Sequence, residues 1–222
     1  MIYLFQPNEK ITADIKEVYR YSGFKDTPTD PYMEKTIKEI KEEIEKAATF
    51  KLCYTKNTLD AISFNFGIGD VNSKSLKKNL CGCHEVYIFA ATIGIDVDRI
   101  ISRYSTLSPS KAVIAQGTGA ALIESLCDCF CETIAKAEEK NSCFMRPRFS
   151  PGYGDFDIKH QKDIINILDA SKHIGVTLTD SLLMLPTKSV TAVMGISKND
   201  NKCIVSGCEN CNKINCEFRR NG

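Results

Sequence analysis

Apolar and polar residues follow one another along this chain with two different periods, which predict helices and short strands in turn. In several stretches apolar residues recur every three to four positions, and this spacing gives a helix one apolar face. The helices predicted in this way cover residues 12–21, 31–48, 73–80, 97–104, 108–140 and 158–172. Short apolar or strictly alternating runs predict strands at residues 50–54, 61–66, 85–93 and 189–196. This mixture predicts one α+β domain, in which helices flank a twisted, mainly antiparallel sheet.

Two of the predicted helices have clear start signals. Asp30-Pro31 and Ser108-Pro109 each place a capping side chain before a proline at the first helical position. The second of these helices contains Gly117-Thr118-Gly119, and a G-x-G triplet can form a phosphate-binding turn. Its flanks are helical, however, and no strand precedes it at the usual short distance. Close packing of this helix against a neighbour is therefore the preferred interpretation.

The same long helix carries a carboxylate and three cysteines along its apolar surface. Glu124 falls at the edge of an apolar stripe, where it is either a boundary residue or a ligand contact. Cys127 and Cys131 share one face of a helix, while Cys129 points nearly the opposite way. Because one helix cannot turn all three thiols toward one metal ion, we interpret them as small core residues.

Composition narrows the class of protein. The chain has 222 residues, of which 43% are hydrophobic, so it can bury a sizeable core. Its net charge of +1 gives no overall field that would attract nucleic acid. The longest apolar run, residues 86–95, is about half of a membrane span, so no membrane partner is expected. The first residues lack a basic start and a cleavage site, and with eleven cysteines this predicts a cytoplasmic protein whose cysteines are thiols or metal ligands.

The last part of the chain differs in character from the rest. Residues 199–222 hold few core residues, so we expect a domain over residues 1–198 followed by a cysteine-rich tail. The cysteines of this tail are Cys203, Cys208, Cys211 and Cys216. Four thiolates on a loop can surround one zinc ion or an iron–sulfur cluster. The spacing lacks the paired CxxC form, so a free or redox-labile tail is an equal alternative.

The segment from Arg146 to Asp157 reads R-P-R-F-S-P-G-Y-G-D-F-D. Two prolines and two glycines exclude a regular helix or central strand and predict a loop of defined shape. Its arginines and its three aromatic rings can together hold an anionic, partly planar ligand. The alternative is a surface connector whose arginines pair with local carboxylates.

A resemblance to a known family begins in this loop. R-F-S-P-G-Y, from Arg148 to Tyr153, resembles the R-x-x-x-G-Y motif of the activation domain of cobalamin-dependent methionine synthase. Downstream, I-I-N-I-L-D-A-S-K-H-I-G-V, T-L-T-D-S-L-L-M-L-P and K-S-V-T-A-V are similar, in the same order, to that family's helix, L-T-E-S…M-x-P segment and S-V-S strand. Upstream, A-A-T-I-G-I-D-V-D-R-I-I and E-V-Y-R-Y-S-G are similar too. The resemblance covers roughly residues 10–197.

The resemblance implies a curved domain around a twisted antiparallel sheet that binds S-adenosylmethionine. In that family an electron, often from flavodoxin, and the methyl group of S-adenosylmethionine return inactive cobalamin to methylcobalamin. Carried over residue by residue, Arg148 grips the carboxylate of the ligand and Tyr153 contacts it by a hydrogen bond or its ring. Pro151 and Gly152 form the tight turn, and Glu124 matches an acid of the long helix that faces the ammonium or sulfonium.

Two departures from the family pattern are visible. Val193, Met194 and Gly195 stand where the family has aromatic residues near the ligand, and an N-terminal acid of the family has no recognisable counterpart. The chain also lacks cobalamin, folate and homocysteine modules, so we expect it to act in trans, as a component of cobalamin-dependent methionine synthase, on a separate methionine synthase or other corrinoid protein. The alternative is a docking or redox partner of a corrinoid methyltransferase, with a metal-binding cysteine tail and no S-adenosylmethionine binding.

Overall fold

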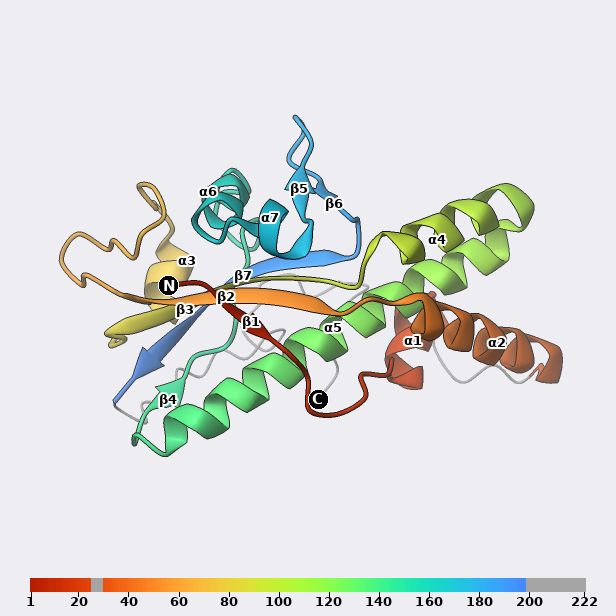
Figure 1. Ribbon diagram of the computed structural model, residues 1–222, viewed down its shortest axis with the longest axis horizontal. Coiled ribbons are helices and arrows are strands. Elements are labelled where there is room, and N and C mark those ends of the chain that lie inside the picture. Colours follow the sequence, from red (N-terminus) through yellow and green to blue (C-terminus); the bar gives the residue numbers. More distant parts are fainter. Residues whose placement is uncertain (25–29, 199–222) are drawn as a thin grey trace.

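The computed structural model describes residues 1–24 and 30–198, and it has three layers, with a sheet between two groups of helices (Figure 1). Within these residues the central sheet has five strands in the order β1-β2-β3-β7-β4, and every neighbouring pair is antiparallel. The strands are β1 (Tyr3–Phe5), β2 (Lys51–Thr58), β3 (Glu85–Thr92), β7 (Ser189–Ser197) and β4 (Phe144–Met145). The predicted α+β fold with a mainly antiparallel sheet is confirmed.

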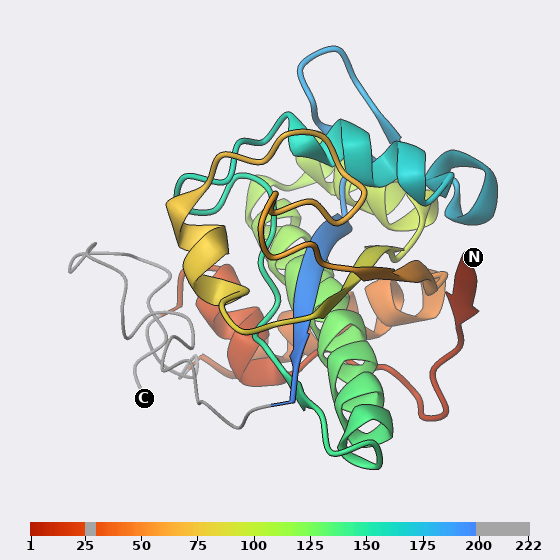
Figure 2. The same cartoon turned by 90° about the vertical axis from the view of Figure 1, so that its left-hand side faces the viewer.

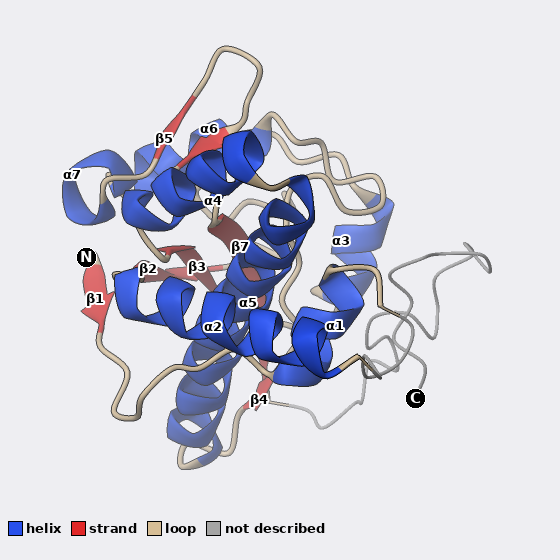
Figure 3. Ribbon diagram, turned by 90° about the vertical axis from the view of Figure 1, so that its right-hand side faces the viewer, coloured by secondary structure: helices blue, strands red, loops and turns tan. Residues whose placement is uncertain are grey.

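Helices cover both faces of this sheet. The larger group consists of α1 (Ile15–Tyr21), α2 (Pro31–Ala47), α4 (Ile95–Leu107) and α5 (Pro109–Glu139), and Figure 3 shows it from the side. The smaller group consists of α3 (Lys74–Asn79), α6 (His160–Ile167) and α7 (Ala170–Ile174). A small hairpin of β5 (Thr177–Leu178) and β6 (Met184–Leu185) projects beyond the second group (Figure 2). None of the helices in the described ranges combines the length and the apolar content that crossing a bilayer requires.

The central strand β3 explains why both faces of the sheet are apolar. Successive side chains of a strand point to opposite faces, so Phe89 packs on the α5 side while Val86 and Ile88 pack on the α6 side. All three are completely buried. A strand that is covered on both faces has a continuous apolar sequence rather than an alternating one. The apolar run at residues 85–93 predicted this strand.

The long helix α5 is fixed to the sheet by Phe130. The centroid of this ring lies 5.2 Å from that of Phe5, 5.1 Å from that of Tyr54 and 5.0 Å from that of Phe89. Helix α5 thereby contacts the edge strand β1 and the two strands that follow it in the sheet. Aromatic side chains of this size dominate the energetics of a core, so Phe130 sets the position of the helix that carries Glu124.

The glycines of α5 allow other parts of the chain to approach closely. A Cβ atom at Gly117 would lie 3.0 Å from the backbone nitrogen of Ser22, directly after α1. A Cβ atom at Gly119 would lie 3.0–3.3 Å from side-chain carbons of Lys188. The close packing expected from this G-x-G triplet is confirmed, and it brings the end of α1 against α5.

Two predicted elements differ from the structure. The strand prediction for residues 61–66 is wrong: this segment is a turn, in which the carboxylate of Asp60 accepts hydrogen bonds from the Ile62 N–H (2.9 Å) and the Ser63 hydroxyl (2.7 Å). An aspartate side chain that bonds to the backbone two residues on competes with strand pairing. The predicted helix at residues 158–172 is divided into α6 and α7, because Asp169 between them has a left-handed φ of 43°.

Candidate functional site around Arg148

Residues 147–148 form a bulge at the edge of the sheet. Before the bulge, the Arg146 N–H donates to the Gly195 carbonyl at 2.8 Å. After it, Phe149 and Val193 exchange two backbone hydrogen bonds of 2.9 Å. Two residues of the outer strand therefore lie opposite a single residue of β7. An insertion of this kind re-aims the side chains that follow it, and it is common at sheet edges.

The bulge sends the two arginines of the loop to opposite faces of the sheet. In a regular strand Arg146 and Arg148 would share one face, because they are two residues apart. Instead, Arg146 is buried on the α3 side, where its Nη2 donates to the Cys81 carbonyl at 3.3 Å. Arg148 extends over α5. The two cations therefore belong to different environments, and only Arg148 contributes to the candidate site.

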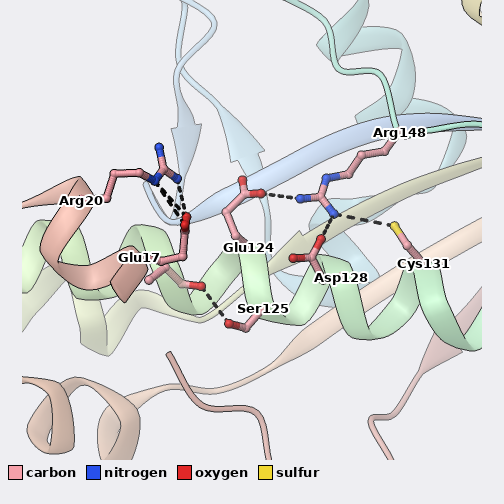
Figure 4. Close-up of polar contacts among 8 residues, drawn as sticks. Glu17, Arg20, Glu124, Ser125, Asp128, Cys131 and Arg148 are labelled. Carbon is pink, nitrogen blue, oxygen red and sulfur yellow. Dashed lines mark hydrogen bonds and ion pairs between the residues drawn. The ribbon is translucent and has the colours of Figure 1, made fainter. Parts of the chain in front are cut away.

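Arg148 meets a row of acceptors on α5, as Figure 4 shows. Its Nη2 donates to Glu124, and its Nη1 donates to Asp128 Oδ1 and lies 3.8 Å from the Cys131 sulfur. These three residues are spaced by four and then three positions, which places them on one face of a helix. Glu124 and Arg148, which the resemblance pairs in one site, are thus in direct contact. We name the Glu124, Asp128 and Arg148 side chains the arginine clamp.

The arginine clamp is half-buried and carries excess negative charge. The side chains are 21% exposed for Arg148, 30% for Glu124 and 51% for Asp128. Burial opposes the charged form of Arg148, but the carboxylates of Glu124 and Asp128 outweigh it and hold the pKa of the guanidinium above its usual value. One cation beside two carboxylates leaves one negative charge uncompensated.

Helix α1 adds a second charged pair beside the clamp. Arg20 donates to Glu17, and its guanidinium lies 4.1 Å from the centroid of the Tyr21 ring. The pKa of Tyr21 is raised by burial and by the nearby carboxylate of Glu124. Glu124 of α5 therefore lies close enough to Tyr21 of α1 to influence its pKa, and in the view of Figure 4 Glu124 lies on the side of Arg148 that faces α1.

Asp128 was not singled out from the sequence, although a signal for it exists. It follows Glu124 by four residues in the predicted helix, so the two carboxylates had to share a face. Glu17 and Arg20 were noted only as part of the E-V-Y-R-Y-S-G segment. Their position next to Glu124 depends on the contact between α1 and Gly117, which no local pattern reveals.

The turn formed by Pro151, Gly152 and Tyr153 lies further around the sheet edge. Pro151 is buried, and Gly152 has a positive φ of 93°, a conformation that glycine adopts without strain. The Tyr153 side chain is 70% exposed, and its ring meets the ring of Phe149 edge-on at 6.5 Å. Phe149 packs on the α6 side of the sheet. Among the described residues, no hydrogen bond, ion pair or ring contact joins Tyr153 to the arginine clamp.

Asp155 fixes this loop to the start of α3. Its carboxylate accepts hydrogen bonds from the Ser73 hydroxyl at 2.6 Å, the Lys74 N–H at 2.7 Å and the Ser75 N–H at 3.0 Å. These bonds, the one from Ser73 above all, hold the pKa of Asp155 well below its ordinary value of 3.8. The loop that follows Arg148 is therefore anchored 80 or more residues away in the sequence.

We expect Asp155→Ala to lower the melting temperature at pH 7 by about 2–4 °C, as loss of a helix cap does in a chain of this size. A depressed folded-state pKa stabilises the fold above the unfolded-state pKa, and this stabilisation disappears as the pH falls through the folded-state value. The gap between wild type and variant should therefore narrow below pH 3.8. Calorimetric melting from pH 2 to pH 7 checks this. The matched control is Asp157→Ala, which removes contacts only to Lys159, two residues away: a hydrogen bond from its N–H at 2.9 Å and an ion pair with its Nζ at 3.2 Å.

The sequence analysis singled out two groups of cysteines, one on α5 and one in the tail. Cys127 is completely buried, Cys129 and Cys131 are half-buried, and burial raises the pKa of all three thiols, in agreement with their interpretation as small core residues. Within residues 1–24 and 30–198, no three His, Cys, Asp or Glu side chains are grouped so that they could hold a metal ion. The tail cysteines proposed as metal ligands, Cys203, Cys208, Cys211 and Cys216, lie outside the described residues.

Comparison with known proteins identifies the family. A family model described as "Vitamin B12 dependent methionine synthase, activation domain" matches residues 41–210, which is more than half of the chain. The chain belongs to this family. The matched region contains the whole arginine clamp and the turn at Tyr153, and the family resemblance seen in the sequence is confirmed.

A solved structure has a similar fold over most of the chain. The chain is similar to the MetH reactivation domain, whose crystal structure holds AdoHcy, that is, S-adenosylhomocysteine. The TM-score is 0.60 and the identity 16%, over 91% of this chain and 80% of the other. At this identity the likeness establishes the fold. No curated protein sequence matches the chain.

Proposed function

We propose that this activation-domain protein binds S-adenosylmethionine and supports reductive remethylation of the cobalamin of a separate methionine synthase or other corrinoid protein. The observation that carries the proposal is the arginine clamp. In a member of this family, it joins the motif arginine to two carboxylates at an accessible edge of the sheet.

The charges of the clamp complement those of S-adenosylmethionine. This ligand has a carboxylate, an ammonium and a sulfonium, so its net charge is +1, while the clamp has a net charge of −1. The Nε–H of Arg148 has no hydrogen-bond partner among the described residues, and it shares one edge of the guanidinium with the second hydrogen of Nη2. That edge can bind the ligand carboxylate with two hydrogen bonds while Glu124 and Asp128 keep theirs.

The turn at Pro151, Gly152 and Tyr153 supplies the other side of the proposed site. Gly152 has no side chain to obstruct a ligand that lies against the backbone, and the exposed ring of Tyr153 can cover a planar group. Because β4 is the edge strand, a ligand that bends around this edge can touch both the turn and the clamp. The AdoHcy present in the MetH reactivation domain supports a ligand of this chemical class.

In this proposal the residues of the chain bind and orient the methyl donor. The corrinoid of the partner supplies the cobalt that accepts the methyl group, together with an electron from flavodoxin or another donor. Arg148 fixes the carboxylate end, and Glu124 and Asp128 hold the cationic centres. The S–CH3 group can then face the partner. The rate gain comes from proximity and orientation, because no side chain of the site has to act as base or nucleophile.

A second function is favoured by two observations. Met194, which stands in the position of a family aromatic residue, is buried in the core on the α5 side and forms no ligand wall. Both Nη atoms of Arg148 already have acceptors within the chain. A protein with these features could dock on a corrinoid methyltransferase without binding S-adenosylmethionine, and its cysteine tail would then serve as metal site or electron relay.

Calorimetric titration of S-adenosylmethionine into the full chain separates the two functions. We expect saturable binding with one ligand per chain, and stimulation of reductive remethylation when a corrinoid partner is added. Absence of binding at ligand concentrations up to about 1 mM, which corresponds to roughly −4 kcal/mol, would contradict the first function and favour the second. Anaerobic metal analysis of the same sample tests the tail, because zinc, an iron–sulfur absorption band and free thiols are distinct results.

A further inference from the structure

We propose that Arg20, stacked on Tyr21 at the end of α1, binds the purine ring of S-adenosylmethionine. This inference rests on the proposed function and adds a ligand contact on a second helix. The arginine clamp holds the amino-acid end of the ligand, and the stack on α1 holds its planar end. The contact is carried by the geometry of the stack and by its position along α5.

Arg20 and Tyr21 form a flat surface that is already fixed in place. The central carbon of the Arg20 guanidinium lies 4.1 Å from the centroid of the Tyr21 ring. The carboxylate of Glu17 accepts hydrogen bonds from Arg20 Nε at 3.2 Å and also from Nη2, and this fork holds the orientation of the guanidinium. One face of the guanidinium lies on the ring, and the Arg20 side chain is 21% exposed. The outer face is therefore the one that a planar ligand can cover.

The stack lies along the face of α5 that carries the clamp. A Cβ atom at Gly117 would lie 3.2 Å from the carbonyl carbon of Tyr21. Glu124 follows Gly117 by seven residues, so the two share one face and are about 11 Å apart along the helix axis. In the view of Figure 4, Arg20 lies on the side of Glu124 away from Arg148. A ligand whose carboxylate is bound by Arg148 can therefore extend past Glu124 to the stack.

The electrostatic evidence agrees with this position. The pKa of Tyr21 is raised by burial and then by the carboxylate of Glu124, so the ring is within range of the clamp. The positive charge of Arg20 is balanced by Glu17, which limits its repulsion of a ligand with a net charge of +1. Electrostatics therefore allows a cationic ligand to approach the guanidinium from its outer face.

A purine ring suits this surface. Guanidinium planes stack on the faces of bases, and the interaction does not depend on hydrogen bonds to the base edge. An adenosyl group joined to methionine is long enough to cover two turns of a helix. Val193, Met194 and Gly195 supply no aromatic ring. Arg20 thus provides a flat surface that β7 lacks.

The exposed ring of Tyr153 is the other flat surface near the site. It meets Phe149 edge-on at 6.5 Å, and Phe149 packs on the α6 side of the sheet. The clamp lies on the α5 side, where the end of α1 also packs. A purine on Arg20 consequently needs no bend of the ligand around the sheet edge, whereas a purine on Tyr153 does.

The test is calorimetric titration of S-adenosylmethionine into the full wild-type chain and into Arg20→Lys. Lysine keeps the charge beside Glu17 but has no plane. We expect the dissociation constant to rise about five- to tenfold, as for loss of one stacked base. S-methylmethionine has the same amino-acid and sulfonium groups without the purine, so its dissociation constant should change less than about twofold. Arg103→Lys is the matched control, because Arg103 pairs with Glu43 and lies 5.2 Å over the ring of Tyr104 on α4, and it should bind both ligands like wild type.

The outcomes separate this inference from the proposed function. If wild type binds S-adenosylmethionine and folded Arg20→Lys binds it equally tightly, the purine lies elsewhere and the inference is overturned, while the proposed function stands. Equal weakening of S-methylmethionine overturns it too, because Arg20 then acts on the amino-acid end. If wild type does not bind S-adenosylmethionine, the proposed function itself fails and the inference fails with it.

Discussion

Replacing Arg148 by alanine is expected to weaken S-adenosylmethionine binding at least about 100-fold and to abolish support for remethylation. Arg148 is the cation of the clamp, and its free edge is the part of the site that can bind a carboxylate with two hydrogen bonds. Its removal also leaves the Glu124 and Asp128 carboxylates without a counter-charge. Truncating one partner of a buried, hydrogen-bonded charge pair costs about 2–5 kcal/mol of binding free energy. Calorimetric titration of wild type and variant measures the loss directly.

Two further variants make this result specific. Arg148→Lys keeps the charge but replaces the planar fork by a point charge, so we expect an intermediate loss on the order of tenfold. Arg99→Ala removes an exposed arginine of α4 that also pairs with an aspartate, and it should bind like wild type. Thermal unfolding of each variant verifies that it is folded. Unchanged ligand affinity in a folded Arg148→Ala variant would disprove the assigned role of Arg148.

The elements that could be predicted from the sequence are those whose signals are local. Asp30 caps α2 through a hydrogen bond to the Tyr32 N–H, with Pro31 at the first helical position, as a side-chain oxygen followed by proline predicts. The buried strand β3 was predicted because ten residues of apolar sequence cannot face water. In contrast, the alternation of residues 61–66 gave a wrong strand, since the Asp60 side chain supplies the backbone bonds that a neighbouring strand would have supplied.

The candidate site was predictable only in part, for a different reason. Resemblance to the family brought Glu124 and Arg148 together, and their contact is present in the structure. This contact depends on the bulge at residues 147–148, which turns Arg148 toward α5. The bulge in turn depends on pairing with β7, a strand more than forty residues later in the sequence. The contact between Arg148 and Asp128 follows from the same bulge. The register between two strands that are distant in the sequence depends on both strands, so no local pattern in one segment could predict it.

The position of the clamp depends in turn on how α5 is fixed to the sheet. Arg148 belongs to the sheet edge, while both carboxylates belong to the helix, so their distance is set by the packing between these two layers. Phe130 follows Asp128 by two residues and faces the sheet instead of the arginine. The helix therefore presents its charges on one face because it buries aromatic surface on another.

Phe130→Ala is accordingly expected to lower the free energy of unfolding by about 3–5 kcal/mol, the range measured for aromatic truncation in a closed core. The ring is completely buried and packs against the rings of Phe5, Tyr54 and Phe89, which belong to three different strands. These neighbours are held by the sheet, so they cannot collapse to fill the cavity. Urea unfolding at 25 °C, monitored by circular dichroism, gives the free energy by linear extrapolation.

The matched variant Phe130→Leu retains most of the apolar volume and should lose only about 1–1.5 kcal/mol. If Phe130→Ala costs less than about 1 kcal/mol, the ring does not hold α5 on the sheet as the structure shows it.

A further expectation links stability to the site. Because the cavity loosens α5 two residues from Asp128, the folded alanine variant should bind S-adenosylmethionine less tightly than the leucine variant, although neither change touches the arginine clamp. Equal affinity would mean that the clamp keeps its geometry independently of this part of the core.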